Sequence, residues 1–100
     1  MLEIKTEENG DQIVIKPEGK VDTNTASDLR EEMVKHVDSF AQIIMDLEKM
    51  VYISSAGLRV FLELDQALKA KGKTLKVKNV NGPIMDVFEM TGFSSVLEFE

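Results

Sequence analysis

Two serines followed by two small residues form the segment of this chain best suited to chemistry, Ile53-Ser54-Ser55-Ala56-Gly57-Leu58, here called the serine loop. Serine oxygens are favoured caps at helix N-termini, so the segment predicts the start of a helix. Because Ala56 and Gly57 shield the backbone amides only weakly, the positive end of that helix dipole is open to an anion. A phosphate on Ser55 would add about −1.5 to −2 charges where negative charge stabilises a helix. We therefore predict a loop that can carry a phosphate.

The same residues also suit a purely structural role. In that interpretation the two serines only cap the helix, and the small residues after them let the helix pack closely against a sheet. The two interpretations differ in the fate of Ser55, which is modified in the first and only a cap in the second. The spacing of these residue types alone leaves both open.

Enzymatic chemistry is not predicted at these serines. A serine nucleophile needs a base within hydrogen-bond reach and a third group that orients the base. The only histidine, His36, is expected near the C-terminal end of a first helix, at the opposite end of the sheet from the serine loop. With one histidine and no cysteine, the chain shows no metal-ligand spacing, and it has no glycine-rich nucleotide loop. We expect no catalytic residue, metal site or cofactor.

Hydrophobic periodicity predicts the elements that must position the serine loop. A β-hairpin turns at Asn9-Gly10, and the continuous apolar run over 42–47 indicates a central strand. The other segments are a helix over 24–37, an apolar patch at 51–53, a helix from the serines to Lys71, a strand over 74–80, a helix from Asn81 to Gly92 and a short strand over 96–99. The order β-β-α-β-α-β-α-β predicts one α/β domain over residues 1–100, with a mostly parallel sheet of about four to five strands, an antiparallel N-terminal hairpin strand and flanking helices.

Polar residues gather where the predicted strands end. The segments 19–24 and 52–57 follow strands that the pattern makes neighbours, and the carboxyl ends of parallel strands meet at one edge of a sheet. We therefore expect the residues around Asp22 to lie beside the serine loop. Asp22 suits a turn or a cap before the first helix, and Thr23 and Asn24 are also interpreted as caps.

The charge and residue composition of the chain argue against some classes of partner. The 18 acidic and 12 basic residues leave a formal charge of −6, which repels nucleic-acid backbones and anionic lipid. The absence of cysteine is compatible with a reducing cytosol, and the alternating start of the chain lacks the apolar core of a signal peptide. No apolar run approaches the roughly 20 residues of a membrane-spanning helix. We expect a cytoplasmic protein with neither a nucleic-acid nor a membrane partner.

Four segments together resemble the STAS family of bacterial anti-sigma factor antagonists. They are Gly19-Lys20-Val21-Asp22, Ile43-Ile44-Met45-Asp46-Leu47, Val51-Tyr52-Ile53-Ser54-Ser55-Ala56-Gly57-Leu58 and Val87-Phe88-Glu89-Met90-Thr91-Gly92-Phe93. In that family a strand leads into Asp-Ser-[Ser/Thr]-Gly-Leu, and a partner kinase phosphorylates the serine after the aspartate. The resemblance places Ser54 at the aspartate position and Ser55 at the acceptor position. Ser55 is thus the expected phosphorylation site, with Ser54 as the alternative.

The resemblance also implies a mechanism of partner switching. The unphosphorylated chain would bind an anti-sigma factor serine/threonine kinase, which uses ATP and Mg²⁺, and phosphorylation would abolish that binding until a PP2C-type phosphatase resets the cycle. The chain itself would not be an enzyme. The residues expected to contact the partner are Asp22, Thr23, Asn24, Ser54, Ser55, Ala56 and Gly57. The alternative is a constitutive STAS interaction scaffold, or a domain that senses a small ligand or nucleotide without phosphorylation.

Overall fold

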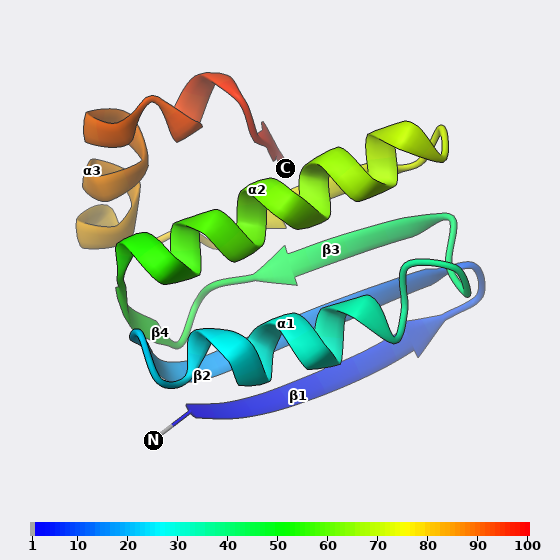
Figure 1. Ribbon diagram of the computed structural model, residues 1–100, viewed down its shortest axis with the longest axis horizontal. Coiled ribbons are helices and arrows are strands. Elements are labelled where there is room, and N and C mark those ends of the chain that lie inside the picture. Colours follow the sequence, from blue (N-terminus) through cyan, green and yellow to red (C-terminus); the bar gives the residue numbers. More distant parts are fainter. Residues whose placement is uncertain (1) are drawn as a thin grey trace.

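The longest strand, β2 (Gln12–Val21), is the axis of the sheet. β1 (Leu2–Asn9) pairs with it antiparallel, β3 (Gln42–Asp46) runs parallel to its first half, and β4 (Met50–Ile53) runs parallel to its last residues. Figure 1 shows this computed structural model, which describes residues 2–100, with β4 continuing past the end of β3. Strands β2 and β4 therefore lead into their helices at the same edge of the sheet.

The other elements complete an α/β fold. They are α1 (Ala26–Val34), α2 (Ser55–Ala70), β5 (Thr74–Lys78), α3 (Gly82–Thr91), the 3₁₀ helix η1 (Phe93–Ser95) and β6 (Glu98–Phe99). β5 lies parallel between β3 and β6, so the strand order is β1-β2-β3-β5-β6, with β4 paired to β2. The predicted fold class, a mostly parallel sheet with an antiparallel N-terminal hairpin strand and flanking helices, is confirmed.

The apolar patch at 51–53 belongs to a strand of its own, so the sheet formed by residues 2–100 has six strands, more than the predicted four to five. The carboxylate of Asp46 accepts a hydrogen bond from the backbone N–H of Glu48 at 3.1 Å, and the N–H of Met50 donates to the carbonyl oxygen of Leu47 at 3.1 Å. These bonds turn the chain out of β3. It then returns to the sheet as β4.

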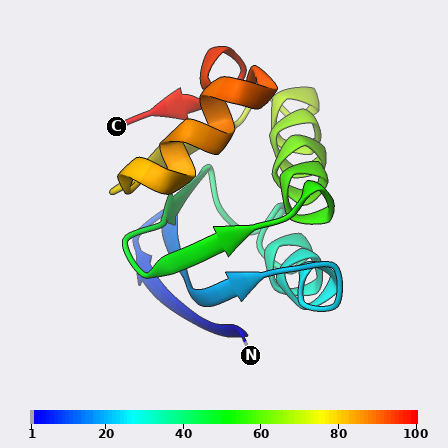
Figure 2. The ribbon, with the colours of Figure 1, turned by 90° about the vertical axis from the view of Figure 1, so that its left-hand side faces the viewer.

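Helices α1 and α2 lie side by side over one face of the sheet (Figures 1 and 2). Apolar side chains from both layers fill the space between them: Ile13, Ile15, Leu29, Met33, Ile43, Met45, Phe61, Leu64, Leu68, Leu75 and Val77. Phe88 of α3 closes this core beside α2, with its ring 6.1 Å from that of Phe61. No helix within residues 2–100 is long and apolar enough to cross a membrane.

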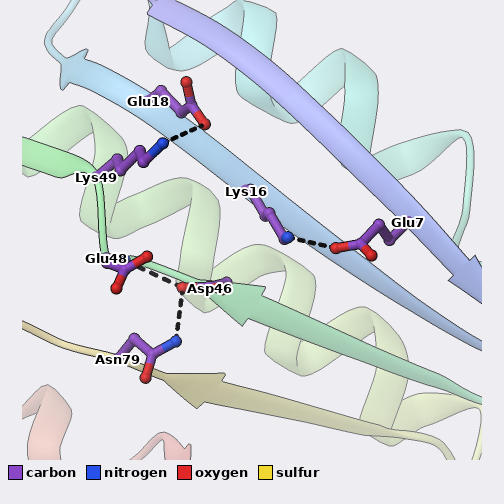
Figure 3. A network of polar contacts seen from close by, with 7 residues as sticks. All are labelled: Glu7, Lys16, Glu18, Asp46, Glu48, Lys49 and Asn79. Atoms are coloured by element: carbon purple, nitrogen blue, oxygen red, sulfur yellow. Dashed lines mark hydrogen bonds and ion pairs between the residues drawn. The ribbon is translucent and has the colours of Figure 1, made fainter.

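The opposite face of the sheet carries charged side chains in place of helices (Figure 3). Lys16 of β2 pairs with Glu7 of β1, and the Lys16 hydrogen bond lowers the pKa of the Glu7 carboxyl. Asp46 is buried at the end of β3, where the Asn79 amide donates to it at 3.1 Å. Hydrogen bonding of this kind is what allows a carboxylate to sit inside the fold.

The first helix is shorter than the predicted span of 24–37. α1 ends at Val34, and the N–H of His36 then bonds three residues back, to the carbonyl of Met33. Val37 and Phe40 remain buried in the following turns, so the apolar periodicity outlasts the helix. The predicted end was therefore wrong because the apolar periodicity continues into turns whose backbone bonds are mostly to the third residue back, after the regular α-helical bonding has ended.

Two predicted strands are also shorter than expected. β5 ends at Lys78 rather than at residue 80, because Asn79 adopts the left-handed conformation (φ 56°), which interrupts an extended strand. β6 covers only residues 98–99 rather than 96–99, because Val96 and Leu97 bond back to Phe93 as part of a tight turn.

Candidate functional site

The serine loop is fixed to the start of the loop that follows β2, residues 22–25, here called the Asp22 loop. Val21 is opposite Ile53 in the parallel pairing of β2 with β4. One residue further on, the N–H of Ser54 donates to the carbonyl oxygen of Val21 at 2.8 Å. The two loops therefore lie together at one edge of the sheet, as the sequence predicts.

Ser54 is the N-cap of α2. Its backbone is extended (φ −91°, ψ 173°), and its hydroxyl oxygen accepts a hydrogen bond from the N–H of Gly57 at 3.2 Å. Its carbonyl oxygen accepts the first helical bond, from Leu58, at 2.9 Å. The side chain of Ser54 is thus half-buried and engaged in capping.

Ser55 differs from Ser54 in both position and exposure. It is the first residue of α2, and its side chain is exposed. Within residues 2–100, its hydroxyl forms no hydrogen bond. The Ser55 hydroxyl is therefore accessible to another protein, and the cap would persist if that hydroxyl were modified.

Gly57 lets α2 start directly against the sheet. A Cβ atom at this position would lie 2.7 Å from Cγ1 of Val21 and 2.8 Å from Cγ1 of Ile53, both shorter than real carbon contacts. Gly57 is therefore buried by the two strands that lead into the site. Gly57 therefore allows the first turn of α2 to pack closely against the sheet, as the structural interpretation of the serine loop predicts.

Asp22 organises its loop. One carboxylate oxygen accepts hydrogen bonds from the N–H groups of Thr25 and Asn24, both at 2.9 Å, and from the Thr25 hydroxyl at 3.1 Å. The backbone hydrogen bond from Thr25 is the largest cause that lowers the pKa of this carboxyl below its ordinary value. Asp22 is thus the turn residue that prepares the start of α1.

Thr23 and Asn24 do not cap α1, contrary to the interpretation of their types. The N-cap is Thr25, whose hydroxyl donates to the carbonyl oxygen of Lys20 at 2.8 Å. The Asp22 carboxylate accepts the N–H groups of Asn24 and Thr25 just before α1 begins, and within residues 2–100 neither Thr23 nor Asn24 accepts an N–H of the helix through its side chain. Thr23 and Asn24 are exposed at the tip of the loop.

A groove of about 350 Å³ separates the first turns of α1 and α2. Its lining residues are Thr23, Ala26, Ser27, Arg30, Ser55, Ala56, Arg59 and Val60. Arg30 crosses from α1 to form an ion pair with Glu63 of α2. Neither arginine was predicted from the sequence to lie beside the serine loop. One signal was available, because Arg59 follows Ser55 by four residues and residues at that spacing share a helix face.

The match with known proteins extends over nearly the whole chain. Residues 3–100 match the family model of the STAS domain. This chain belongs to the STAS domain family. The Ser55 position and its surroundings therefore lie inside a STAS domain, at the start of its second helix.

Curated relatives of this STAS domain are named for the regulation of sigma factors. The anti-sigma-B factor antagonist of Bacillus subtilis (strain 168) is 29% identical over 97 residues, which are 97% of this chain and 87% of that protein. The anti-sigma-B factor antagonist of Listeria monocytogenes is 30% identical over 100 residues, covering 99% of this chain and 87% of that protein. The putative antagonist BtrV of Bordetella bronchiseptica is 34% identical over 80 residues, covering 79% and 69%.

Solved structures share the STAS fold. An anti-sigma factor antagonist from Mycobacterium paratuberculosis superposes with a TM-score of 0.90 at 22% identity, covering 99% of this chain and 85% of that one. The Bacillus protein SpoIIAA in its phosphorylated form superposes with a TM-score of 0.77 at 18% identity, covering 98% and 91%. At these identities the likeness concerns the fold.

The single histidine of the STAS domain, His36, contacts neither Ser54 nor Ser55 within residues 2–100. His36 lies in the turn after α1, where its ring contacts Glu32 at 3.0 Å and Phe40, with ring centroids 5.8 Å apart. It was expected near the end of the helix, and it lies just beyond that end. Within residues 2–100, no group of three or more acidic, histidine or cysteine side chains could hold a metal ion.

Proposed function

We propose that this STAS domain, residues 1–100, is an anti-sigma factor antagonist that binds an anti-sigma factor serine/threonine kinase and loses that binding when Ser55 is phosphorylated. The observation that carries the proposal is the division of roles between the two serines. Ser54 caps α2 through its hydroxyl, whereas Ser55 exposes its hydroxyl at the first helical position. The names of the curated relatives support the class of partner.

The chemistry would be carried out by the partners. In the kinase, the Ser55 oxygen attacks the γ-phosphorus of ATP bound with Mg²⁺, and the bond from that phosphorus to ADP breaks as the new O–P bond forms. A base of the kinase takes the hydroxyl proton. A PP2C-type phosphatase then returns the serine by adding water to the phosphorus and releasing inorganic phosphate. The chain is a substrate in both steps, and cytoplasmic partners of this kind place it in the cytoplasm.

Phosphorylation is expected to change the surface and leave the fold intact. A phosphate at the first turn of α2 lies at the positive end of the helix dipole, where negative charge is stabilising. A partner that covers the loop when Ser55 is neutral would have to accommodate about two negative charges. An uncompensated charge of this kind weakens an interface by several kcal/mol.

The proposed contact surface combines both loops: Asp22, Thr23, Asn24, Ser54, Ser55, Ala56 and Gly57. Thr23 and Asn24 are exposed, and Thr23 lines the same groove as Ser55, so both suit direct contact. Gly57 is buried, so it would contribute by holding α2 against the strands. Asp22 would contribute by shaping the loop that presents its neighbours.

The test is phosphorylation by the anti-sigma factor kinase of the same cell, with ATP and Mg²⁺, followed by mass mapping. The parent chain and Ser54→Ala should both incorporate phosphate at position 55, and Ser55→Ala should incorporate none. Equal incorporation into Ser55→Ala and the parent would overturn the assignment. If the unmodified chain is never phosphorylated and binds its partner constitutively, the scaffold or ligand-sensing alternative is the correct one.

A further inference from the structure

Both arginines of the chain line the groove beside Ser55. Ten of the 12 basic residues are lysines, and within residues 2–100 none of those lysines lines this groove. Arg30 reaches it from α1 and Arg59 from α2. Arginine differs from lysine in presenting a planar fork of donors that matches a phosphate or carboxylate with two parallel hydrogen bonds. The type and the placement of these cations therefore suit an oxyanion.

Arg59 is placed to reach an oxyanion on Ser55. The two residues are four apart on α2, so they share one face of the helix, one turn apart. Long side chains on a helix point back toward its N-terminus and cover the preceding turn. For Arg59, that preceding turn begins with Ser55.

Arg30 faces the same groove from the other helix. It pairs with Glu63, and both side chains are about half exposed, at 48% and 49%. Exposed ion pairs contribute little stability, so this pair can exchange when a stronger anion is near. A phosphate carries about twice the charge of the Glu63 carboxylate and more acceptor oxygens.

We infer that the groove between α1 and α2 is a cradle in which Arg59, together with Arg30, binds the phosphoryl group on Ser55 of the same chain. The inference rests on the proposed function, because it takes Ser55 as the modified residue. Binding within the chain holds the phosphoryl group against the groove, where its charge of about −1.5 to −2 largely neutralises the two positive charges of Arg30 and Arg59. It also withdraws both guanidinium groups from any partner that covers the loop.

The test is a ³¹P NMR titration of the full chain with phosphoserine inserted at position 55 during translation. Neighbouring cations favour the dianion and so lower the second pKa of a phosphate. Arg59→Gln should therefore raise that pKa by about half a unit or more, and Arg59→Lys by less. The matched control is Lys35→Gln, which removes a cation from the turn after α1, outside the groove, and should change nothing. An identical titration in the parent and Arg59→Gln would overturn the cradle.

Two further variants test the role of Arg30 in the same titration. Arg30→Gln should raise the phosphate pKa, whereas Glu63→Gln releases Arg30 and should lower it. Thermal melts of each variant establish that it is folded before it is titrated. Because the phosphoserine is inserted independently of any kinase, failure of the cradle leaves the assignment of Ser55 intact. Failure of the kinase to modify Ser55 would overturn the proposed function and leave the titration valid.

Discussion

The N–H of Ser54 donates to the carbonyl oxygen of Val21 at 2.8 Å, which continues the parallel pairing of β2 with β4 by one residue past the end of β4. This bond joins the last residue before α2 to the last residue before the Asp22 loop. The relative position of the two loops is therefore set by sheet hydrogen bonding. Exposed side chains on the two loops, such as those of Thr23 and Ser55, are thereby held at the same edge of the sheet.

Ser54→Ala should lower the free energy of unfolding by about 1 kcal/mol, because it removes the acceptor of the Gly57 N–H at the start of α2. Urea denaturation monitored by circular dichroism measures the change. The matched control is Ser55→Ala, which removes an exposed hydroxyl and should stay within about 0.5 kcal/mol of the parent. Equal losses for the two variants would contradict the division of roles between the serines.

Gly57→Ala should destabilise the domain by about 1–3 kcal/mol, because the new methyl group would lie 2.7 Å from Val21 and 2.8 Å from Ile53. The higher helix propensity of alanine, about 1 kcal/mol, offsets only part of this loss. The control is Gly82→Ala in the first turn of α3, where a Cβ atom meets nothing within 4 Å. Thermal melts should show a lower Tm for the first variant alone.

Ser55→Asp should weaken binding to the anti-sigma factor kinase by about tenfold or more, because it places a charge in the proposed interface. Its Tm should change little, since a carboxylate in the first turn of a helix is favourable. Isothermal titration calorimetry gives the affinity. The neutral variant of the same shape, Ser55→Asn, separates charge from size: binding equal to that of Ser55→Asp would show that size is responsible.

Asp22→Asn should reduce stability in a pH-dependent manner. The folded-state pKa of Asp22 is lowered, first by the backbone hydrogen bond from Thr25, so its carboxylate stabilises the fold above the unfolded-state pKa of about 4. That contribution is lost as the pH falls through the lower folded-state value. The difference in unfolding free energy between the parent and Asp22→Asn should therefore be largest near neutral pH and shrink in acid.

A urea series at neutral pH and below about pH 4 measures this difference. Asp28→Asn is the control, because Asp28 lies in the first turn of α1 and none of the hydrogen bonds of the Asp22 loop involves it within residues 2–100. A constant difference across the series would contradict the role of the Asp22 charge in the turn.

The arrangement of the site was predictable because it depends on strand order. Alternating strands and helices dictate a parallel sheet, and a parallel sheet gathers the loops after β2 and β4 at one edge. Which of Ser54 and Ser55 caps α2 was not predictable from the residue types, because either hydroxyl could cap a helix that starts one residue earlier or later. Only the backbone of Ser54, which is extended while Ser55 is already helical, decides which serine is engaged.

Contacts between α1 and α2 could not be predicted from the hydrophobic periodicity of the sequence. The pairing of Arg30 with Glu63 depends on how α1 and α2 pack against each other, and residues 33 apart in the chain give no local signal of that packing. The short strand β4 was missed as a separate element for a related reason. Its four residues are too few to establish a period, and its pairing with β2 is a long-range event.

The outer strand β1 has an effect on which surfaces of the molecule can associate. Within residues 2–100 it pairs on one side only, and such an edge is a template for strand addition by another chain. Glu3, Lys5 and Glu7 place alternating charges on the helix-free face along this edge, and Glu7 pairs on that same face with Lys16 of β2. Charges in these positions discourage pairing of the β1 edge with the same edge of another copy of the protein.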